Sequence, residues 1–200
     1  MQILLYRLRL ACFFVALLTS LQCKAEELPT ALRQLFPVSY VVMTYAMADL
    51  NGDGNTDYVV VLRSKLEDAL LKKGQPAPRR PLLVFLHGAA NTFKLVGRND
   101  KVVFAADEGG QCDPFLDGEE GLAVKASYFT VQNSVACGQH WTDYFTFRYS
   151  QEQRGIVFHK RISESWVMNA SATGDALVLD GRKVVSAKKN KPVLLGDYAP

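Results

Sequence analysis

The chain has 200 residues, of which 48% are hydrophobic and 22% charged, with 23 Lys and Arg against 20 Asp and Glu. Three of the basic residues, Arg7, Arg9 and Lys24, precede residue 26 and no acidic residue does, so residues 26–200 carry no net charge. No block of Lys and Arg interleaved with aromatic residues follows, which argues against a nucleic-acid partner. The length of residues 26–200 predicts one domain.

The N-terminus is typical of an export signal. Two arginines precede a short apolar run over 10–18, which small and polar residues follow. The run is too short to span a membrane, which takes about 20 apolar residues. We therefore expect a signal peptide over 1–25, cleaved after Ala25, and a periplasmic or secreted mature chain without a transmembrane span. Lipid anchoring at Cys23 is the less favoured alternative, because Gln22 is too large for the usual lipidation motif.

The elements that follow are mainly β. A short amphipathic helix is expected over 28–35, and a helical turn over 66–71 within the polar connection 65–81. Runs that are apolar throughout or that alternate with polar residues predict strands over 40–46, 58–62, 81–86, 127–131, 144–149, 155–159, 165–168 and 176–179. The pattern predicts an all-β fold, either an antiparallel β-sandwich or a partial-propeller-like sheet, in a single domain over 26–200.

A loop between the first two expected strands places oxygen-bearing side chains at every second position. These side chains are Asp49, Asn51, Asp53, Asn55 and Asp57. Calcium takes six to eight oxygen ligands, and glycine in such a loop allows a sharp turn. Carboxylates about 5 Å apart would repel by roughly 3 kcal/mol per pair at an effective dielectric near 20, and a bound cation removes this repulsion. We predict a calcium site here; an Asx-rich turn is the alternative.

The loop differs from an EF-hand, because its twelfth position is Val60 and not a bidentate Glu. A calcium loop that joins two strands resembles the FG-GAP (integrin-type, VCBS-like) repeat, here as a single copy over about 39–63. The resemblance implies a structural calcium site in an extracytoplasmic β-protein. In that site Asn55 would give its carbonyl and Asp57 a carboxylate or a water bridge. The segments 98–101, 137–144 and 164–166 resemble a family of uncharacterised secreted bacterial proteins, and this resemblance implies no activity.

Two cysteines, Cys112 and Cys137, follow the expected leader. An even pair in an oxidising compartment predicts a disulfide. It would close a loop of about 26 residues and stabilise the fold by roughly 3.5 kcal/mol in the chain-entropy model. The alternative is a catalytic thiol at Cys137 assisted by His140, three residues away.

An acidic, glycine-rich segment over 106–121 offers three interpretations. Its carboxylates are Asp107, Glu108, Asp113, Asp117, Glu119 and Glu120. They could form a solvated loop, which is the favoured interpretation, a second cation site, or a carboxylate pair for glycoside cleavage. The polar and aromatic segment 138–141 is expected at a core or rim position beside the disulfide, with a sugar platform as the alternative. Arg79 and Arg80 are expected to be solvated.

Two functional hypotheses follow. The favoured one is a non-enzymatic binding or inhibitory module with a structural calcium ion, because the strongest motif is a metal loop of structural type. Its partner would be a protein, such as an effector or a lysozyme-like enzyme that it inhibits, or an envelope polymer. The alternative is a calcium-dependent hydrolase of cell-wall or glycan substrates that uses carboxylates of the 107–120 loop.

Overall fold

The computed structural model describes residues 27–115, 121–171 and 173–200. The chain divides into two compact units, Met1–Thr30 and Ala31–Pro200, and every strand belongs to the second. The expected signal peptide, its cleavage site and Cys23 lie outside the described residues. In the part of the chain that is described, no helix has the length and apolar character needed to cross a membrane.

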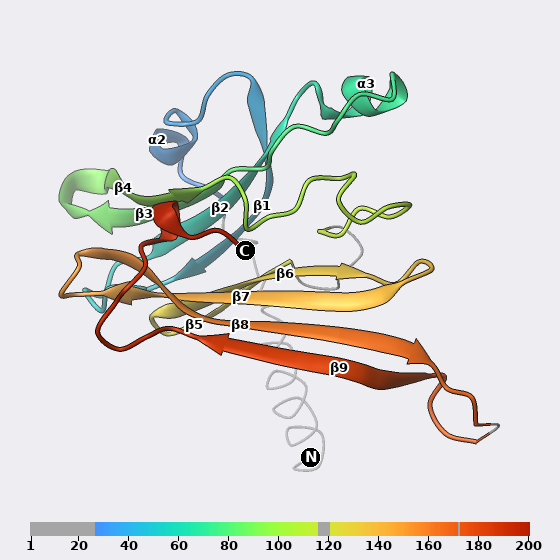
Figure 1. Cartoon of the computed structure of the whole chain (residues 1–200). Helices are drawn as coiled ribbons and strands as arrows, with labels where there is room; N and C mark the ends of the chain where they lie inside the picture. Colours follow the sequence, from blue (N-terminus) through green and yellow to red (C-terminus); the bar gives the residue numbers. More distant parts are fainter. Residues whose placement is uncertain (1–26, 116–120, 172) are drawn as a thin grey trace, which may run out of the picture. The chain divides into compact units, whose positions relative to one another are not determined.

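The second unit consists of two antiparallel sheets (Figure 1). The first sheet contains β1 (Tyr40–Ala48), β2 (Asp57–Ser64), β3 (Leu82–Gly88) and β4 (Thr92–Asn99) in that order. The second contains β5 (Leu122–Lys125), β6 (Tyr128–Val135), β7 (His140–Ser150), β8 (Gly155–Met168) and β9 (Leu177–Ser186). The helices are α2 (Thr30–Arg33), α3 (Glu67–Lys72) and the short 3-10 turns η1 (Ala89–Asn91) and η2 (Leu195–Asp197). The prediction of an all-β fold with antiparallel sheets and a short N-terminal helix is confirmed.

The two sheets share one core. Alternate residues point to the same face of a strand, so each sheet contributes one row of apolar side chains. These rows include Val59, Val61 and Val84 from the first sheet and Phe129, Phe145 and Phe147 from the second. Phe129 and Phe147 stack with their ring centroids 5.5 Å apart, across neighbouring strands.

The first sheet is buried on its other face as well. Tyr58 and Val60 lie between the core residues of β2, and both are at most 3% exposed. The ring of Phe36 packs 6.0 Å from that of Phe85, and the ring of Phe93 packs 5.7 Å from that of Tyr58. Burial on both faces explains why β2 is apolar at consecutive positions, as a strand covered on both sides requires.

Some expected boundaries were wrong. The predicted strands 155–159 and 165–168 form one strand, β8. They were predicted as two because the residues between them are mostly polar. Strand β4 was not predicted, because its exposed face is polar and Gly97 interrupts its pattern. A Cβ at Gly97 would lie 2.8 Å from Leu195 and 3.4 Å from Ile156, so glycine here permits close packing. The expected helix over 28–35 is shortened to Thr30–Arg33.

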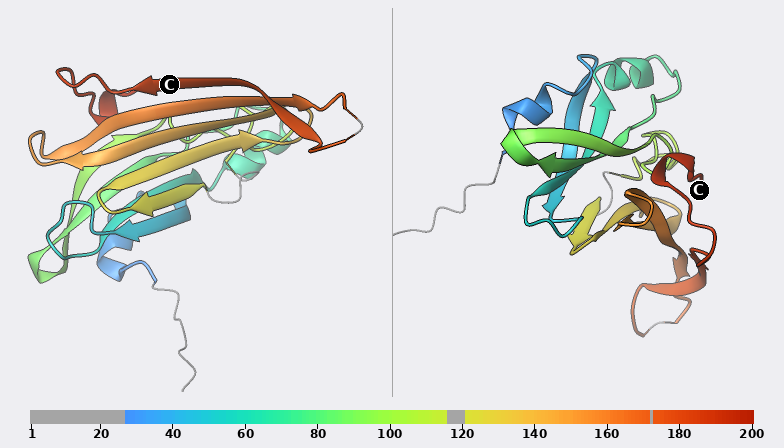
Figure 2. Two further views of the ribbon diagram at one scale, coloured as in Figure 1. Left: turned by 90° about the horizontal axis from the view of Figure 1, so that it is seen from below. Right: turned by 90° about the vertical axis from the view of Figure 1, so that its left-hand side faces the viewer.

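The second sheet has an open side. Its strands β6 to β9 run side by side, and the hairpin of β8 and β9 reaches beyond the first sheet (Figure 1). The face that points away from the core has no described helix or strand over it in either view of Figure 2. Within the described part of the chain, one broad face of this sheet is therefore uncovered.

Candidate functional site

The loop 49–57 connects β1 and β2 and forms a tight turn around Asp49. The Oδ1 atom of Asp49 accepts hydrogen bonds from the backbone N–H of Gly52 at 2.7 Å and of Asp53 at 3.1 Å. Its Oδ2 atom accepts one from the N–H of Gly54 at 2.9 Å. Gly52 and Gly54 have φ angles of 78° and 84°, which glycine adopts without strain. The chain thus curls around one carboxylate.

Asn51, Asp53 and Asn55 are joined within the same turn. Asn51 Nδ2 donates to Asp53 Oδ2 at 2.8 Å, and Asn51 Oδ1 accepts from the Asp53 N–H at 3.0 Å. The Asn55 N–H donates to Asp53 Oδ1 at 2.8 Å. The hydrogen bonds from the Asn51 side chain and from the Asn55 N–H lower the pKa of Asp53. Asp53 is therefore held as an exposed carboxylate.

Asp57 has a different environment, because it is fully buried at the start of β2. Its Oδ2 atom accepts from the Leu50 N–H and its Oδ1 atom from the His87 N–H, both at 2.9 Å. Burial raises the pKa of Asp57, and the backbone hydrogen bonds act in the opposite direction. Asp57 therefore ties the loop to the end of β3.

The carboxylates of the loop do not suffice for a calcium ion, which would also need side-chain amide and backbone carbonyl oxygens as ligands. Among the described residues, no three His, Cys, Asp or Glu side chains are grouped so that they could hold a metal ion. An ion in this loop would depend on Asp49, Asp53, the Asn51 side chain and the Asn55 carbonyl, with Asp57 reached through water. Backbone N–H groups already face Asp49 and Asp57, which reduces the carboxylate repulsion that the sequence alone suggested.

The acidic segment that follows residue 106 is held by ion pairs and backbone hydrogen bonds. Asp107 accepts from the Ala77 N–H at 2.9 Å, and Glu108 accepts from the Ala105 N–H at 2.7 Å. Asp113 forms a two-pronged ion pair with Arg80. All three carboxylates thus have structural partners, which weakens the case for an acid–base pair here. Three further acidic residues of the proposed catalytic loop, Asp117, Glu119 and Glu120, lie outside the described residues.

Arg80 is completely buried, so the expectation that it is solvated was wrong. It donates to both carboxylate oxygens of Glu67, at 2.7 and 3.1 Å, as well as to Asp113. Burial alone would lower its pKa, but the hydrogen bonds to Asp113 and Glu67 outweigh burial and raise it. Arg79, the next residue, keeps 57% of its side chain exposed and pairs with Glu108. Sequence alone does not distinguish these two arginines.

Cys112 and Cys137 form a disulfide with their Cα atoms 6.2 Å apart, as predicted. The bond ties the acidic segment to the turn between β6 and β7. A disulfide fits an oxidising, extracytoplasmic compartment. It also leaves no free thiol at Cys137, so the alternative of a nucleophile assisted by His140 loses its reactive group.

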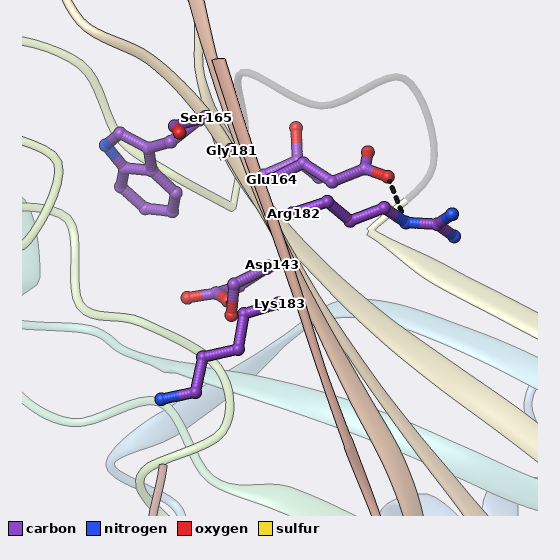
Figure 3. Close-up of a pocket in the computed structure, with 9 residues that line it drawn as sticks. Asp143, Glu164, Ser165, Gly181, Arg182 and Lys183 are labelled. Carbon is purple, nitrogen blue, oxygen red and sulfur yellow. Dashed lines mark hydrogen bonds and ion pairs between the residues drawn. The ribbon is translucent and has the colours of Figure 1, made fainter. Parts of the chain in front are cut away.

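A shallow pocket of about 390 Å³ lies on β7, β8 and β9 next to Trp141. Figure 3 shows Asp143 and Lys183 on one side of these strands and the ion pair of Glu164 and Arg182 on the other. Asp143 accepts two hydrogen bonds from Arg161, at 2.8 and 3.1 Å, and a further one from the Ser163 hydroxyl. Both acidic residues that line this pocket, Asp143 and Glu164, are therefore already paired with arginines.

The open face of the second sheet carries a separate group of polar and aromatic side chains. We call it the outer face and define it by Tyr128, Thr130, Tyr144, Lys160, Ile162 and Arg182, which line a shallow depression of about 530 Å³. The hydroxyls of Thr130 and Thr146 are 3.0 Å apart, across β6 and β7. The rings of Tyr128 and His159 meet edge to face at 5.1 Å. The alternating pattern of β7 allowed part of the outer face to be predicted from the sequence. The rest of the face lies on β8, which was not predicted as one strand.

The comparisons with known proteins leave the family open. No family model matches the chain, and no curated protein does. The resemblance to the FG-GAP repeat therefore rests on the loop alone. A solved structure described as a Xanthomonas type IV secretion system related protein is similar, with a TM-score of 0.37 and 18% identity. The similarity covers 75% of this chain and 56% of that one, so the chain spans little more than half of its length.

Proposed function

We propose that this chain is an exported calcium-binding β-protein that acts as a non-enzymatic binding or inhibitory module. The observation that carries the proposal is the turn 49–57. There Asp49, Asn51 and Asp53 bring side-chain oxygens from alternate positions into one exposed turn. Oxygen donors of this kind on a glycine-containing loop suit calcium.

When bound, calcium would supply positive charge at the connection between β1 and β2. Asp49, Asn51 and Asp53 would hold it with side-chain oxygens, Asn55 with its carbonyl, and Asp57 through a water molecule. Because Asp57 also accepts the His87 N–H at 2.9 Å, the site is linked to the end of β3. We therefore assign the ion a structural role, as a brace for the first sheet.

A binding role is favoured over hydrolysis by what the described carboxylates do. Asp107, Glu108 and Asp113 accept backbone hydrogen bonds or pair with arginines. A general acid needs a carboxyl group that can give up its proton to the substrate, and a carboxylate held by an arginine does not offer one. The outer face, in contrast, presents tyrosine, threonine and basic side chains that no described element covers. The partner would be a protein or an envelope polymer.

Thermal unfolding with calcium and with chelator tests the proposal. Calcium at 100 times its dissociation constant adds about 2.7 kcal/mol to the free energy of unfolding. For a chain of this size, that corresponds to a rise in Tm of about 5–10 °C. The rise should vanish in Asp53→Ala and persist in Asp180→Ala, which removes an exposed carboxylate from β9. Equal Tm values with calcium and with chelator in the unmodified protein would refute calcium binding.

A further inference from the structure

The described side chains of the outer face carry an excess of positive charge, although residues 26–200 as a whole are neutral. Lys125, Lys160 and Arg148 lie on or beside it, and none of them has an ion pair with a described carboxylate. Glu164, the one acidic residue among the described residues that line this depression, forms an ion pair with Arg182 at 3.0 Å. A face with three cations that have no carboxylate partner among the described residues favours a partner that carries negative charge.

The surroundings of His159 include two of these cations. Burial lowers its pKa first, and the nearby charges of Lys160 and Arg148 lower it further. Two cations on neighbouring strands thus act on the same imidazole. Lys160 and Arg148 therefore lie close enough together to act on one group of this face.

The centre of the outer face is apolar and aromatic. Tyr144 of β7 lies opposite Ile162 of β8, and Ile162 lies opposite Val184 of β9. Val184 is 53% exposed and Tyr128, at the other side of the face, 37%. An apolar centre with tyrosine and a basic rim is the composition of a protein–protein interface.

The strands that carry these side chains are well ordered by pairing. β7 pairs with β8 from His140 to Ser150, with one register shift after Thr146, and the Thr130 and Thr146 hydroxyls join β6 to β7 at 3.0 Å. A sheet face of this kind does not need to rearrange to bind, and preorganisation of the surface favours affinity.

We propose that the outer face binds an acidic segment of a partner protein that also carries apolar or aromatic side chains. The acidic groups would pair with Lys125, Arg148 and Lys160, and the apolar side chains would cover the row formed by Tyr144, Ile162 and Val184. This rests on the proposed role as a binding module but does not require calcium. A polyanionic glycan would be attracted by the same cations and would leave the apolar row uncovered.

The test measures affinity for defined probes by titration of the full protein. The probes are a short synthetic peptide with alternating Glu and Leu, the same peptide with Lys in place of Glu, and polygalacturonate. We expect binding of the acidic peptide alone, weakened by salt. The double change Arg148→Glu and Lys160→Glu should reduce the affinity about tenfold or more, since it removes two ion pairs and adds repulsion.

Two further variants separate the charge of the face from the charge of the protein and from the apolar row. Lys183→Glu makes the same kind of change on the opposite side of the same sheet (Figure 3) and should leave the affinity within about twofold, because the peptide would not contact this side. Val184→Ser should weaken peptide binding while the fold, followed by circular dichroism, is unchanged.

Three results would overturn the proposal: no binding of the acidic peptide, an equal loss in Lys183→Glu, or binding of polygalacturonate without the peptide. The titrations are run with calcium and with chelator. A protein that does not bind calcium can then be distinguished from one whose outer face does not bind the peptide.

Discussion

Replacement of Arg80 by alanine should destabilise the protein far more than the same change at Arg79. The guanidinium of Arg80 is completely buried and faces Glu67, whose side chain is only 2% exposed, and Asp113, which is 19% exposed. Arg80→Ala removes the two hydrogen bonds to the buried Glu67 carboxylate and leaves it only the more distant Arg63, at 3.9 Å. Loss of one member of a buried ion pair lowers the free energy of unfolding by about 3–5 kcal/mol.

Arg79 provides the matched control. Its ion pair with Glu108 lies at the surface, where the Arg79 side chain is 57% exposed. Exposed ion pairs contribute about 0–1 kcal/mol, so Arg79→Ala should change the free energy of unfolding by no more than that.

Urea unfolding of the oxidised protein measures both changes. A double-mutant cycle with Glu67→Gln adds a second criterion. The neutral amide of glutamine removes the buried negative charge that Arg80→Ala would leave poorly compensated. The two changes should couple by about 1–3 kcal/mol, which is the range for residues in direct contact. Equal effects of Arg79→Ala and Arg80→Ala, or strict additivity with Glu67→Gln, would refute the assigned role of Arg80.

Two further predictions concern the loop and the packing between the sheets. Burial raises the pKa of Asp57 above its unfolded value, so protonation of Asp57 favours the folded state. The stability gained from this group is present below the unfolded pKa and lost as pH rises through the folded pKa. The destabilisation measured for Asp57→Asn should therefore grow as pH falls from 7 towards 4, and a constant difference would contradict this. Gly97→Ala places a methyl group 2.8 Å from Leu195 and should lower the free energy of unfolding by about 1–3 kcal/mol. In Gly155→Ala the new Cβ has no neighbour closer than 3.6 Å, so this change should lower the free energy of unfolding by less than Gly97→Ala does. Equal effects of the two changes in urea unfolding would argue against tight packing at Gly97.

The fold could be predicted where a local pattern determines it. The run Val59–Val61 is buried on both faces and has the β-branched composition that this requires. Phe145 and Phe147 alternate with polar residues, as expected of a strand with one buried face. The middle of β8 fails this criterion because Ser163 and Glu164 interrupt the apolar pattern, yet they bond to Asp143 and Arg182 on neighbouring strands. Partners so distant in sequence leave no local signal.

The candidate sites divide in the same way. The turn 49–57 is recognisable because its donors lie within nine consecutive residues, and the disulfide because two cysteines follow the expected leader. The burial of Asp57 was not predictable, since one of its hydrogen-bond donors is His87, 30 residues away. The outer face depends on the register of β6 to β9, which brings Tyr144, Ile162 and Val184 into one row. The local sequence pattern alone does not reveal which residues of neighbouring strands lie opposite one another.

The calcium site is tested most directly by the backbone amide resonances of the turn during a calcium titration. The N–H groups of Gly52, Asp53 and Gly54 donate to Asp49, so coordination of this carboxylate would change their surroundings. We predict saturable shifts at these three amides in the unmodified protein and none in Asp53→Ala, with the amides of β7 unchanged in both. If the three resonances keep the same positions in millimolar calcium and in chelator, the turn 49–57 is an Asx-rich turn and not a calcium site.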